Sequence, residues 1–123
     1  MISEAEVRRI AAATKVDPMV IDLDYSLGWF LLGMRKTNTS LGGLIFKGGT
    51  CLRKCYFPDY RFSEDLDFTA TNHLSPAEVE GWITKSVDWI SDHDGPDFRV
   101  QPIHLEVVDD EYGSESYQAR IYY

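Results

Sequence analysis

Three helix-start signals determine much of the order of elements in this 123-residue sequence. In segments 3–6 and 75–78, a serine is followed three residues later by a glutamate, which is the spacing of a capping box. Asp17 directly precedes Pro18, so a cap residue is followed by proline at the first helical position. Apolar residues recur at helical spacing after each signal. The pattern predicts helices over 4–15, 18–36 and 76–94.

Short apolar or alternating runs between these helices predict strands over 44–46, 65–69, 98–108 and 117–123. The apolar run 44–46 is expected to be a buried strand, and Leu66 and Phe68 in the alternating run are expected to face the core. The last two are expected to form a hairpin around residues 109–116. A short helix is expected to begin at Thr50 and to end before Pro58. Helices and strands in this order predict an α/β (α+β) fold, with a small mixed sheet flanked by helices.

Length and composition predict a single soluble domain, 1–123, with N-terminal helices at 1–36 and a sheet-and-helix core at 44–123. Apolar stretches span only a few residues, and the N-terminus lacks the basic-then-apolar pattern of a signal peptide. We therefore expect no membrane partner and a cytoplasmic location. Cys51 and Cys55 are too few for a disulfide scaffold, and we interpret both as small buried apolar residues.

The net charge of −8 is unevenly distributed along the chain. Residues 35–61 contain six bases and one acid, whereas residues 88–115 contain nine acids and one base. Taken alone, both stretches are typical of solvated faces. An average of −8 argues against a polyanionic partner, but the basic stretch can still hold a phosphate locally.

Two motifs in this part of the chain point to phosphate chemistry. Asp65 and Asp67 are two apart on a predicted strand, so their side chains share one face, with α-carbons about 6.5 Å apart. Such paired carboxylates suit Mg²⁺ or Mn²⁺, which bind through one or two carboxylates plus substrate phosphates. Residues 47–50 read Lys-Gly-Gly-Thr. Adjacent glycines let the backbone approach a ligand closely, and a helix start offers free amides to a phosphate.

Either motif alone has a simpler explanation. An isolated pair of aspartates two apart usually lies on a solvated surface, and an isolated Gly-Gly-Thr usually forms a strand-to-helix turn without a ligand. Lys47 adds a point charge and Thr50 adds a hydroxyl donor to the turn. Together the motifs predict an anion cradle and a metal-ligand pair on neighbouring strands.

The combined string resembles one known family. Residues 46–54, FKGGTCLRK, followed by residues 61–68, RFSEDLDF, resemble the AbiEii-type nucleotidyltransferase toxins of bacteria. That family belongs to the DNA polymerase β-like nucleotidyltransferase superfamily and supplies the toxin of toxin–antitoxin pairs. A weaker resemblance extends over 22–34 and 117–121. The resemblance implies a nucleotidyltransferase-like sheet flanked by helices.

The resemblance also implies an activity. A nucleotidyl group moves from an NTP, with Mg²⁺ or Mn²⁺, to an acceptor hydroxyl, and pyrophosphate is released. The implied partners are the NTP, a transfer RNA or protein acceptor, and a cognate antitoxin. The expected nucleotide-binding residues are Lys47, Gly48, Gly49, Thr50 and Ser63, and the expected metal-binding and catalytic pair is Asp65 and Asp67.

One departure from the family concerns a third carboxylate. In the superfamily it comes from a strand after the segment that resembles 117–123, and relatives continue into a helical region. The chain is therefore expected to be an N-terminal portion, truncated at its C-terminus, with an incomplete catalytic set. Glu106, Asp109 and Asp110 are the nearby acids considered as substitutes for the third carboxylate, and their position in or beside an acidic turn favours a solvated role.

Two other functions stay open at this point. One is a non-catalytic truncated homologue that acts as a protein-interaction module, through the acidic stretch 88–115 or through a homodimer at an open sheet edge near Tyr123. The other is a metal-dependent phosphohydrolase, for which the sequence offers no recognisable water-activating base. For Arg53 and Lys54 the sequence does not choose between contact with phosphate or acceptor RNA and a solvated helix face. For Arg61 it does not choose between a pair with Glu64 or Asp65 and contact with the nucleotide.

Overall fold

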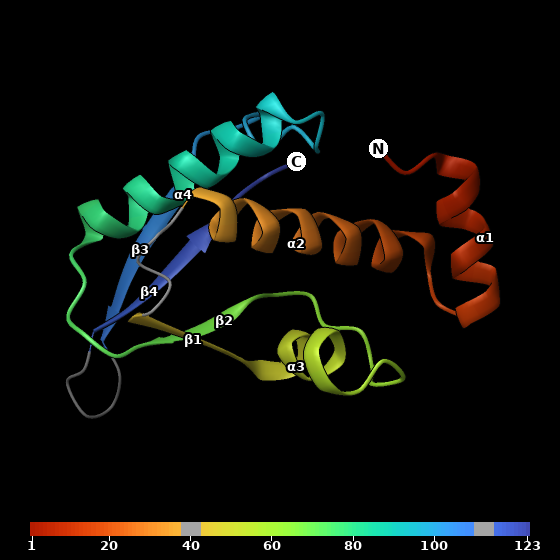
Figure 1. The fold of residues 1–123 in the computed structure, drawn as a ribbon, viewed down its shortest axis with the longest axis horizontal. Coiled ribbons are helices and arrows are strands. Elements are labelled where there is room, and N and C mark those ends of the chain that lie inside the picture. The colour runs from red at the N-terminus through yellow and green to blue at the C-terminus, as the bar shows by residue number, and fades with distance from the viewer. Residues whose placement is uncertain (38–42, 110–114) are drawn as a thin grey trace.

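The computed structural model describes residues 1–37, 43–109 and 115–123, and in these residues the fold is α+β, as predicted (Figure 1). The helices are α1 (Glu4–Thr14), α2 (Pro18–Thr37), α3 (Gly48–Cys51) and α4 (Pro76–Asp92), and a π-helical turn, η2 (Leu52–Tyr56), continues α3. The strands are β1 (Leu44–Lys47), β2 (Asp67–Ala70), β3 (His104–Asp109) and β4 (Glu115–Arg120). None of the helices described is both long enough and apolar enough to span a membrane.

The predicted helix starts are confirmed. Ser3 and Ser75 each accept a hydrogen bond from the third helical amide, and the glutamate at that position reaches back to the cap amide. Asp17 Oδ1 accepts a 2.8 Å hydrogen bond from the amide of Met19 at the start of α2. The first two helices end within one residue of the prediction, whereas α4 ends at Asp92, two residues earlier than predicted.

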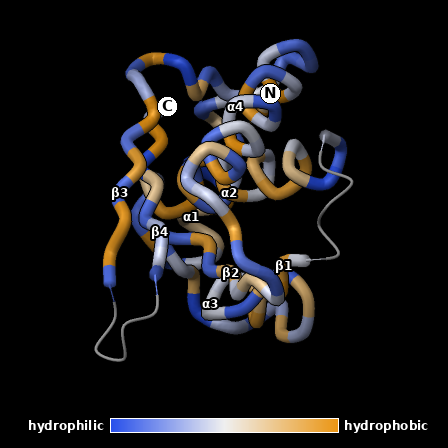
Figure 2. Tube along the Cα trace, turned by 90° about the vertical axis from the view of Figure 1, so that its left-hand side faces the viewer, coloured by the Kyte–Doolittle hydropathy of each residue, from blue (hydrophilic) through white to orange (hydrophobic). Residues whose placement is uncertain are grey.

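The strands form two separate antiparallel pairs, β1–β2 and β3–β4, rather than the single mixed sheet predicted from the sequence. A parallel pair needs a long crossover connection, usually a helix packed on the sheet. Here the helical segment after β1 instead returns the chain beside it in the opposite direction, with Lys47 opposite Asp67. The β3–β4 hairpin is confirmed, and Figure 2 shows it along one flank of the molecule.

Three strands are shorter than predicted. β2 begins two residues after Asp65, whose carbonyl accepts a hydrogen bond from the Thr50 hydroxyl. β3 begins at His104 rather than at residue 98. β4 ends at Arg120, and the Tyr123 ring, predicted to lie in a strand, packs at 5.9 Å between centroids against the buried Phe98.

The β1–β2 pair is covered on one face only. The rings of Phe46 and Phe68 stack across the two strands with centroids 5.2 Å apart, and both side chains are half-buried. Leu66 and Phe68 pack against the main core, as the alternating pattern predicted. The prediction that 44–46 is a buried strand is wrong for Ile45, which is 55% exposed. A two-stranded sheet with one covered face leaves the alternate side chains in solvent.

The main core lies between α2 and α4, above the β1–β2 pair in the view of Figure 1. Its buried residues are Phe30, Met34, Ile83, Val87, Ile90 and Phe98. Gly33 lets the two helices approach closely, because a Cβ atom there would lie 2.8 Å from Ile90 Cδ1 and 3.0 Å from the Ser86 carbonyl oxygen. This helix pair supports the strands that carry the candidate site.

A second, smaller core joins α1 to the N-terminal half of α2. Val7, Ala11 and Ile21 are buried there, and Phe62 packs against them from the segment between η2 and β2. The N-terminal helices thus contact the RFSEDLDF segment directly.

Candidate active site

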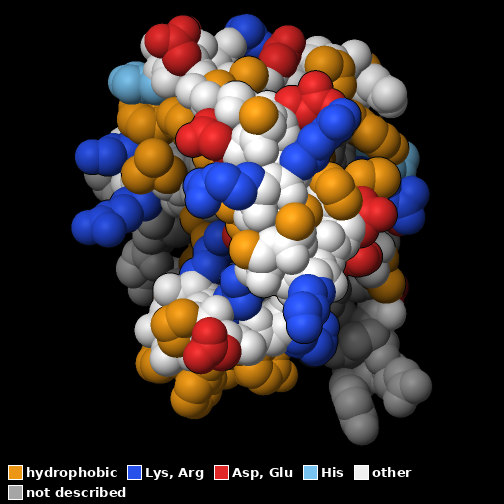
Figure 3. Space-filling view, turned by 90° about the vertical axis from the view of Figure 1, so that its right-hand side faces the viewer, with side chains coloured by type: hydrophobic (Ala, Val, Ile, Leu, Met, Phe, Trp, Pro, Cys, Tyr) orange, Lys and Arg blue, Asp and Glu red, His pale blue; other side chains and the backbone are white. Residues whose placement is uncertain are grey.

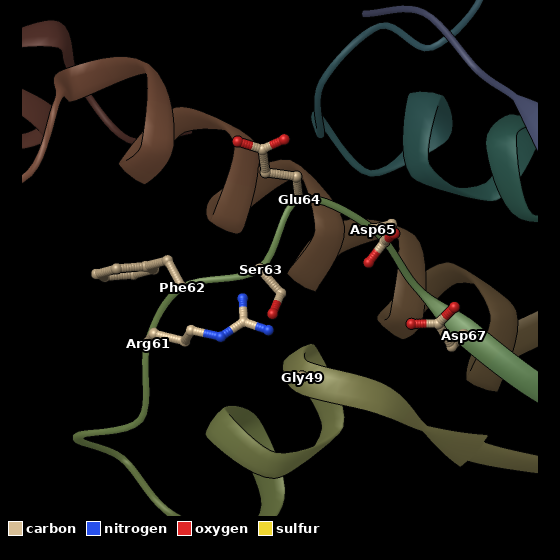
Figure 4. Close-up of a pocket in the computed structure, with 7 residues that line it drawn as sticks. All are labelled: Gly49, Arg61, Phe62, Ser63, Glu64, Asp65 and Asp67. Atoms are coloured by element: carbon tan, nitrogen blue, oxygen red, sulfur yellow. The ribbon is translucent and has the colours of Figure 1, made fainter.

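A cavity of about 360 Å³ lies where the chain leaves β1 and where it enters β2 (Figure 4). It is lined by Gly49, Arg61, Phe62, Ser63, Glu64, Asp65 and Asp67. Its volume lies in the range of about 300–1,000 Å³ that is usual for small-molecule sites. The fold therefore brings the glycine motif and the paired aspartates to one place, as the sequence predicted.

The two glycines allow the turn after β1 to pack directly on the segment that carries the carboxylates. Gly48 has a φ of +79°, a conformation that favours glycine. A Cβ atom on Gly48 would overlap the Asp67 carboxylate and lie 3.1 Å from Asp67 Cβ and Cγ. A Cβ atom on Gly49 would overlap Ser63 Oγ and lie 3.3 Å from Ser63 Cβ. A residue with a side chain would displace the Asp67 carboxylate at the first position or the Ser63 hydroxyl at the second.

The helical segment begins at Gly48, two residues earlier than predicted, with Lys47 as its extended cap residue. Thr50 therefore lies inside the first turn, where it is only 1% exposed. Its hydroxyl donates a 2.6 Å hydrogen bond to the carbonyl oxygen of Asp65. This bond ties the glycine turn to the aspartate segment, while the contact between Thr50 and a nucleotide stays a prediction.

Both predicted metal ligands reach the cavity. Asp65 is exposed in the bend before β2, and Asp67 is half-buried as the first residue of that strand. Figure 4 shows both carboxylates directed into the space beside Gly49. Lys47 is exposed and pairs with Asp67 in the register of the two strands. The predicted charges therefore lie together at this end of the sheet.

The donor set suits a Mg²⁺ or Mn²⁺ ion that shares its ligands with a phosphate. Mg²⁺ in nucleotide sites is usually bound by one or two carboxylates plus phosphate oxygens. Asp65 and Asp67 supply two carboxylates from one wall of the cavity. Across residues 1–37, 43–109 and 115–123, His, Cys, Asp and Glu form no group of three that could hold an ion by themselves. The residues fit an ion whose ligands are two carboxylates and phosphate oxygens of the substrate, rather than an ion coordinated by protein side chains alone.

Arg61 is a cavity residue whose role the sequence left open. Its side chain points toward Gly49 in Figure 4, and its Nη2 would lie 3.7 Å from a Cβ atom on that glycine. Among the residues described, Arg61 forms no ion pair with Glu64 or Asp65. The guanidinium therefore faces the cavity with its donors available. Its position inside the RFSEDLDF string was the only sequence signal for it.

Ser63 is buried, and its hydroxyl lies next to Gly49 at the cavity. The structure thus brings the predicted nucleotide residue Ser63 within van der Waals distance of the turn. Glu64 also lines the cavity. It was not among the predicted site residues, although it directly precedes the aspartate pair.

Two basic residues after the glycine turn make internal contacts. Arg53 Nη1 donates to the carbonyl oxygen of Pro58 at 2.8 Å and to that of Tyr60. Lys54 Nζ lies 3.1 Å from Asp24 Oδ1, and this ion pair joins η2 to α2. Both cations are therefore engaged with their own chain, an arrangement that the sequence did not predict.

The two cysteines differ in environment. Cys51 is buried, and burial raises the pKa of its thiol, with a further contribution from the neighbouring Cys55. Cys55 itself is exposed, so the prediction that both are buried is wrong for this residue. The reason is that no side chain of η2 is buried, because this turn lies at the surface.

The acids of the hairpin lie outside the cavity. Glu106 and Asp109 are exposed on β3, in the sheet that does not line it, and Asp110 lies outside the described residues. Glu106 Oε1 accepts a 2.7 Å hydrogen bond from His104 Nε2, and this bond lowers the pKa of Glu106. The solvated role expected for Glu106 and Asp109 agrees with their exposure.

Comparison with known proteins identifies a family. A family model described as "Nucleotidyl transferase AbiEii toxin, Type IV TA system" matches residues 29–121, about three quarters of the chain. The match includes β1, the glycine turn, the cavity-lining segment and the hairpin. No curated protein and no solved structure matches the chain. The chain belongs to the AbiEii family of nucleotidyltransferase toxins from type IV toxin–antitoxin systems.

Proposed function

We propose that this chain binds an NTP together with Mg²⁺ or Mn²⁺ in the cavity and transfers a nucleotidyl group to an acceptor hydroxyl. The acceptor oxygen forms a bond to the α-phosphorus, and the bond from that phosphorus to pyrophosphate breaks. The observation that carries the proposal is the convergence of the glycine turn, Arg61 and the aspartate pair on one cavity. Family membership supports the same reaction class.

Each wall of the cavity has a role in this proposal. Asp65 and Asp67 hold the metal, which when bound neutralises charge on the phosphates and orients them. The amides at the start of the glycine turn donate to phosphate oxygens, and the missing Cβ atoms let the phosphate approach. The Arg61 guanidinium forms paired hydrogen bonds with a phosphate. Ser63 and Lys47 add a hydroxyl donor and a positive charge.

We propose transfer RNA as the acceptor, with a protein hydroxyl as the competing case, and a cognate antitoxin as the partner that restrains the toxin in the cytoplasm. Figure 3 supports a polyanionic acceptor locally, because Lys and Arg side chains gather around a hollow on the face that contains α1. Incubation with α-labelled NTP and total transfer RNA would test this part. Label in the RNA supports it, whereas label only in protein overturns it.

Calorimetric titration with each NTP, with and without Mg²⁺, tests the site itself. The wild-type chain is expected to bind at least one NTP in a metal-dependent manner. The double variant Asp65→Ala with Asp67→Ala should weaken that binding more than about tenfold, because both carboxylate ligands are lost. The matched control is Glu106→Ala with Asp109→Ala, which removes two exposed carboxylates from β3.

The control pair should leave NTP binding unchanged. If no NTP binds to the wild-type chain, or if both double variants behave alike, the proposed site is wrong. Light scattering after size-exclusion chromatography then tests one of the two alternatives, an interaction module. A stable homodimer without NTP binding would favour that module over an enzyme, since each strand pair has outer edges available for pairing within the described residues.

A further inference from the structure

We infer that Arg53 is a positioning residue, which holds the cavity-lining residues Arg61 and Ser63 in place without itself touching the substrate. This role rests on the proposed nucleotide site. Arg53 follows the glycine turn by a few residues and belongs to η2. Its charge and its position made it a candidate phosphate ligand, but its contacts give it a different task.

The guanidinium of Arg53 connects three points of the next segment of the chain. Nη1 donates to the carbonyl oxygens of Pro58 and Tyr60, which belong to a stretch without regular secondary structure. The guanidinium carbon also lies 3.6 Å from the centroid of the Phe62 ring. A single side chain therefore satisfies two carbonyls and covers one ring just before the chain enters the cavity.

Phe62 is held from its other side by the N-terminal helices. It packs against the small core of Val7, Ala11 and Ile21. Arg53 and this core together hold the ring of Phe62 in one orientation. The anchor thus joins three elements, η2, α1 and α2, to the segment that carries the RFSEDLDF string.

The orientation of Phe62 determines where its neighbours point. In extended backbone, successive side chains lie on opposite sides of the chain. Figure 4 shows the Phe62 ring on the other side of the chain from the side chains of Arg61 and Ser63, which point toward Gly49, and Phe62 also borders the cavity. Fixing the ring of the middle residue on its side of the chain therefore fixes the two flanking side chains on the other side. A rotation of this segment would remove the guanidinium and the hydroxyl from the cavity together.

Lysine cannot replace arginine in this role. An ammonium group is a compact charge and lacks the planar fork that can donate to two carbonyls while it lies flat on an aromatic ring. Arg53→Lys keeps the charge and removes the geometry, and Arg53→Gln removes both. Arg8→Gln is the matched control, because Arg8 is an exposed α1 residue whose ion-pair partner is Glu4.

Two measurements on the full chain test the inference. In the absence of nucleotide, chymotrypsin cleavage after Tyr60 and Phe62 reports local loosening. Cleavage after Trp82 and Trp89 in α4 reports global unfolding in the same sample. Calorimetry with Mg²⁺ and the NTP that the wild-type chain binds then gives the affinity of each variant.

We expect Arg53→Gln to raise cleavage in the 57–62 segment about tenfold and to weaken nucleotide affinity by a similar factor. Cleavage in α4 should not change. Arg53→Lys should give intermediate values in both measurements, and Arg8→Gln should match the wild-type chain.

Three outcomes overturn the inference. Cleavage that stays at the wild-type level while affinity falls would make Arg53 a direct ligand. Increased cleavage in the 57–62 segment with unchanged nucleotide affinity would show that Arg53 has no role at the site. Equal increases of cleavage in this segment and in α4 would indicate a general loss of stability. If the wild-type chain binds no NTP, the proposed function fails, and the cleavage measurement alone decides whether Arg53 holds the segment.

Discussion

The two strand pairs of this molecule have the same strand number and the same antiparallel pairing, yet only β1–β2 forms part of a candidate site. Around β1–β2, polar side chains make contacts between segments: Thr50 with the Asp65 carbonyl, and Arg53 with the chain at Pro58 and Tyr60. Around β3–β4, the Tyr117 hydroxyl donates a 2.6 Å hydrogen bond to the carbonyl oxygen of Leu74, whereas the contact between His104 and Glu106 joins two neighbours on one strand.

This difference shows where polar residues carry functional information. A buried hydroxyl or amide needs a partner, so a buried polar residue such as Thr50 constrains the surrounding chain. An exposed carboxylate needs none. The acids of residues 88–115 contribute most of the net charge, and those that the structure describes do not line the cavity. Of the buried polar residues described, Thr50 and Ser63 adjoin the candidate site, whereas Ser26 and Ser86 lie in α2 and α4. Neither burial of polar groups nor charge density identifies the site by itself.

The largest effect is expected for Gly48→Ala. Alanine at a φ of +79° is strained by about 1–2 kcal/mol, and its Cβ would displace the Asp67 side chain. We expect the urea midpoint to fall and metal-dependent NTP binding to weaken more than about tenfold.

Gly81→Ala is the matched control for this substitution. Nothing lies within 4 Å of a Cβ atom at Gly81, which is inside α4. Alanine there should stabilise the helix by up to about 1 kcal/mol. If Gly48→Ala behaves like Gly81→Ala in both urea unfolding and NTP titration, the close approach of turn and strand has no functional importance.

A smaller effect is expected for Thr50→Val. The variant keeps the shape of the side chain but leaves the Asp65 carbonyl without its hydroxyl partner, at a cost of about 1–2 kcal/mol in unfolding free energy. Thr50→Ser retains the hydroxyl and should retain most of the stability. Urea titrations of both variants make the comparison. A loss for Thr50→Ser together with no loss for Thr50→Val would show that the methyl group matters and that the hydrogen bond does not.

The smallest effect is expected in the hairpin. The hydrogen bond from His104 lowers the pKa of Glu106 below its ordinary value. Because the pKa of Glu106 is lower in the folded state, the hydrogen bond stabilises the fold fully above the unfolded pKa of about 4.3. This stabilisation is lost as the pH falls through the pKa of the folded state. Glu106→Gln should therefore lower the urea midpoint slightly at about pH 6 and not at about pH 3. If Glu106→Gln lowers the urea midpoint more than Thr50→Val does, the expected order of effects in the two strand pairs is wrong.

Much of the local structure could be predicted because it depends on local chemistry. The two capping boxes, the Asp17–Pro18 start and the hairpin all involve residues close in sequence. The division into two sheets could not be predicted, because it depends on how the chain returns after η2. The exposure of Ile45 and Cys55 likewise depends on which faces the tertiary fold covers.

The candidate site followed from the sequence in part. The glycine motif and the aspartate spacing predicted that Gly49, Asp65 and Asp67 meet at one place, whereas Lys47, Gly48 and Thr50 are not among the residues that line the cavity. The orientation of Arg61 and the internal contacts of Arg53 and Lys54 could not be predicted, because a basic side chain has the same sequence signal whether it faces a ligand or its own backbone.

Amide hydrogen exchange with and without Mg²⁺ and the bound NTP tests the central claim most directly, since it compares both strand pairs in one sample. The account predicts added protection at residues 47–50 and 61–67 and none at 104–109 or 115–120. Protection of the hairpin without protection of the glycine turn would contradict it.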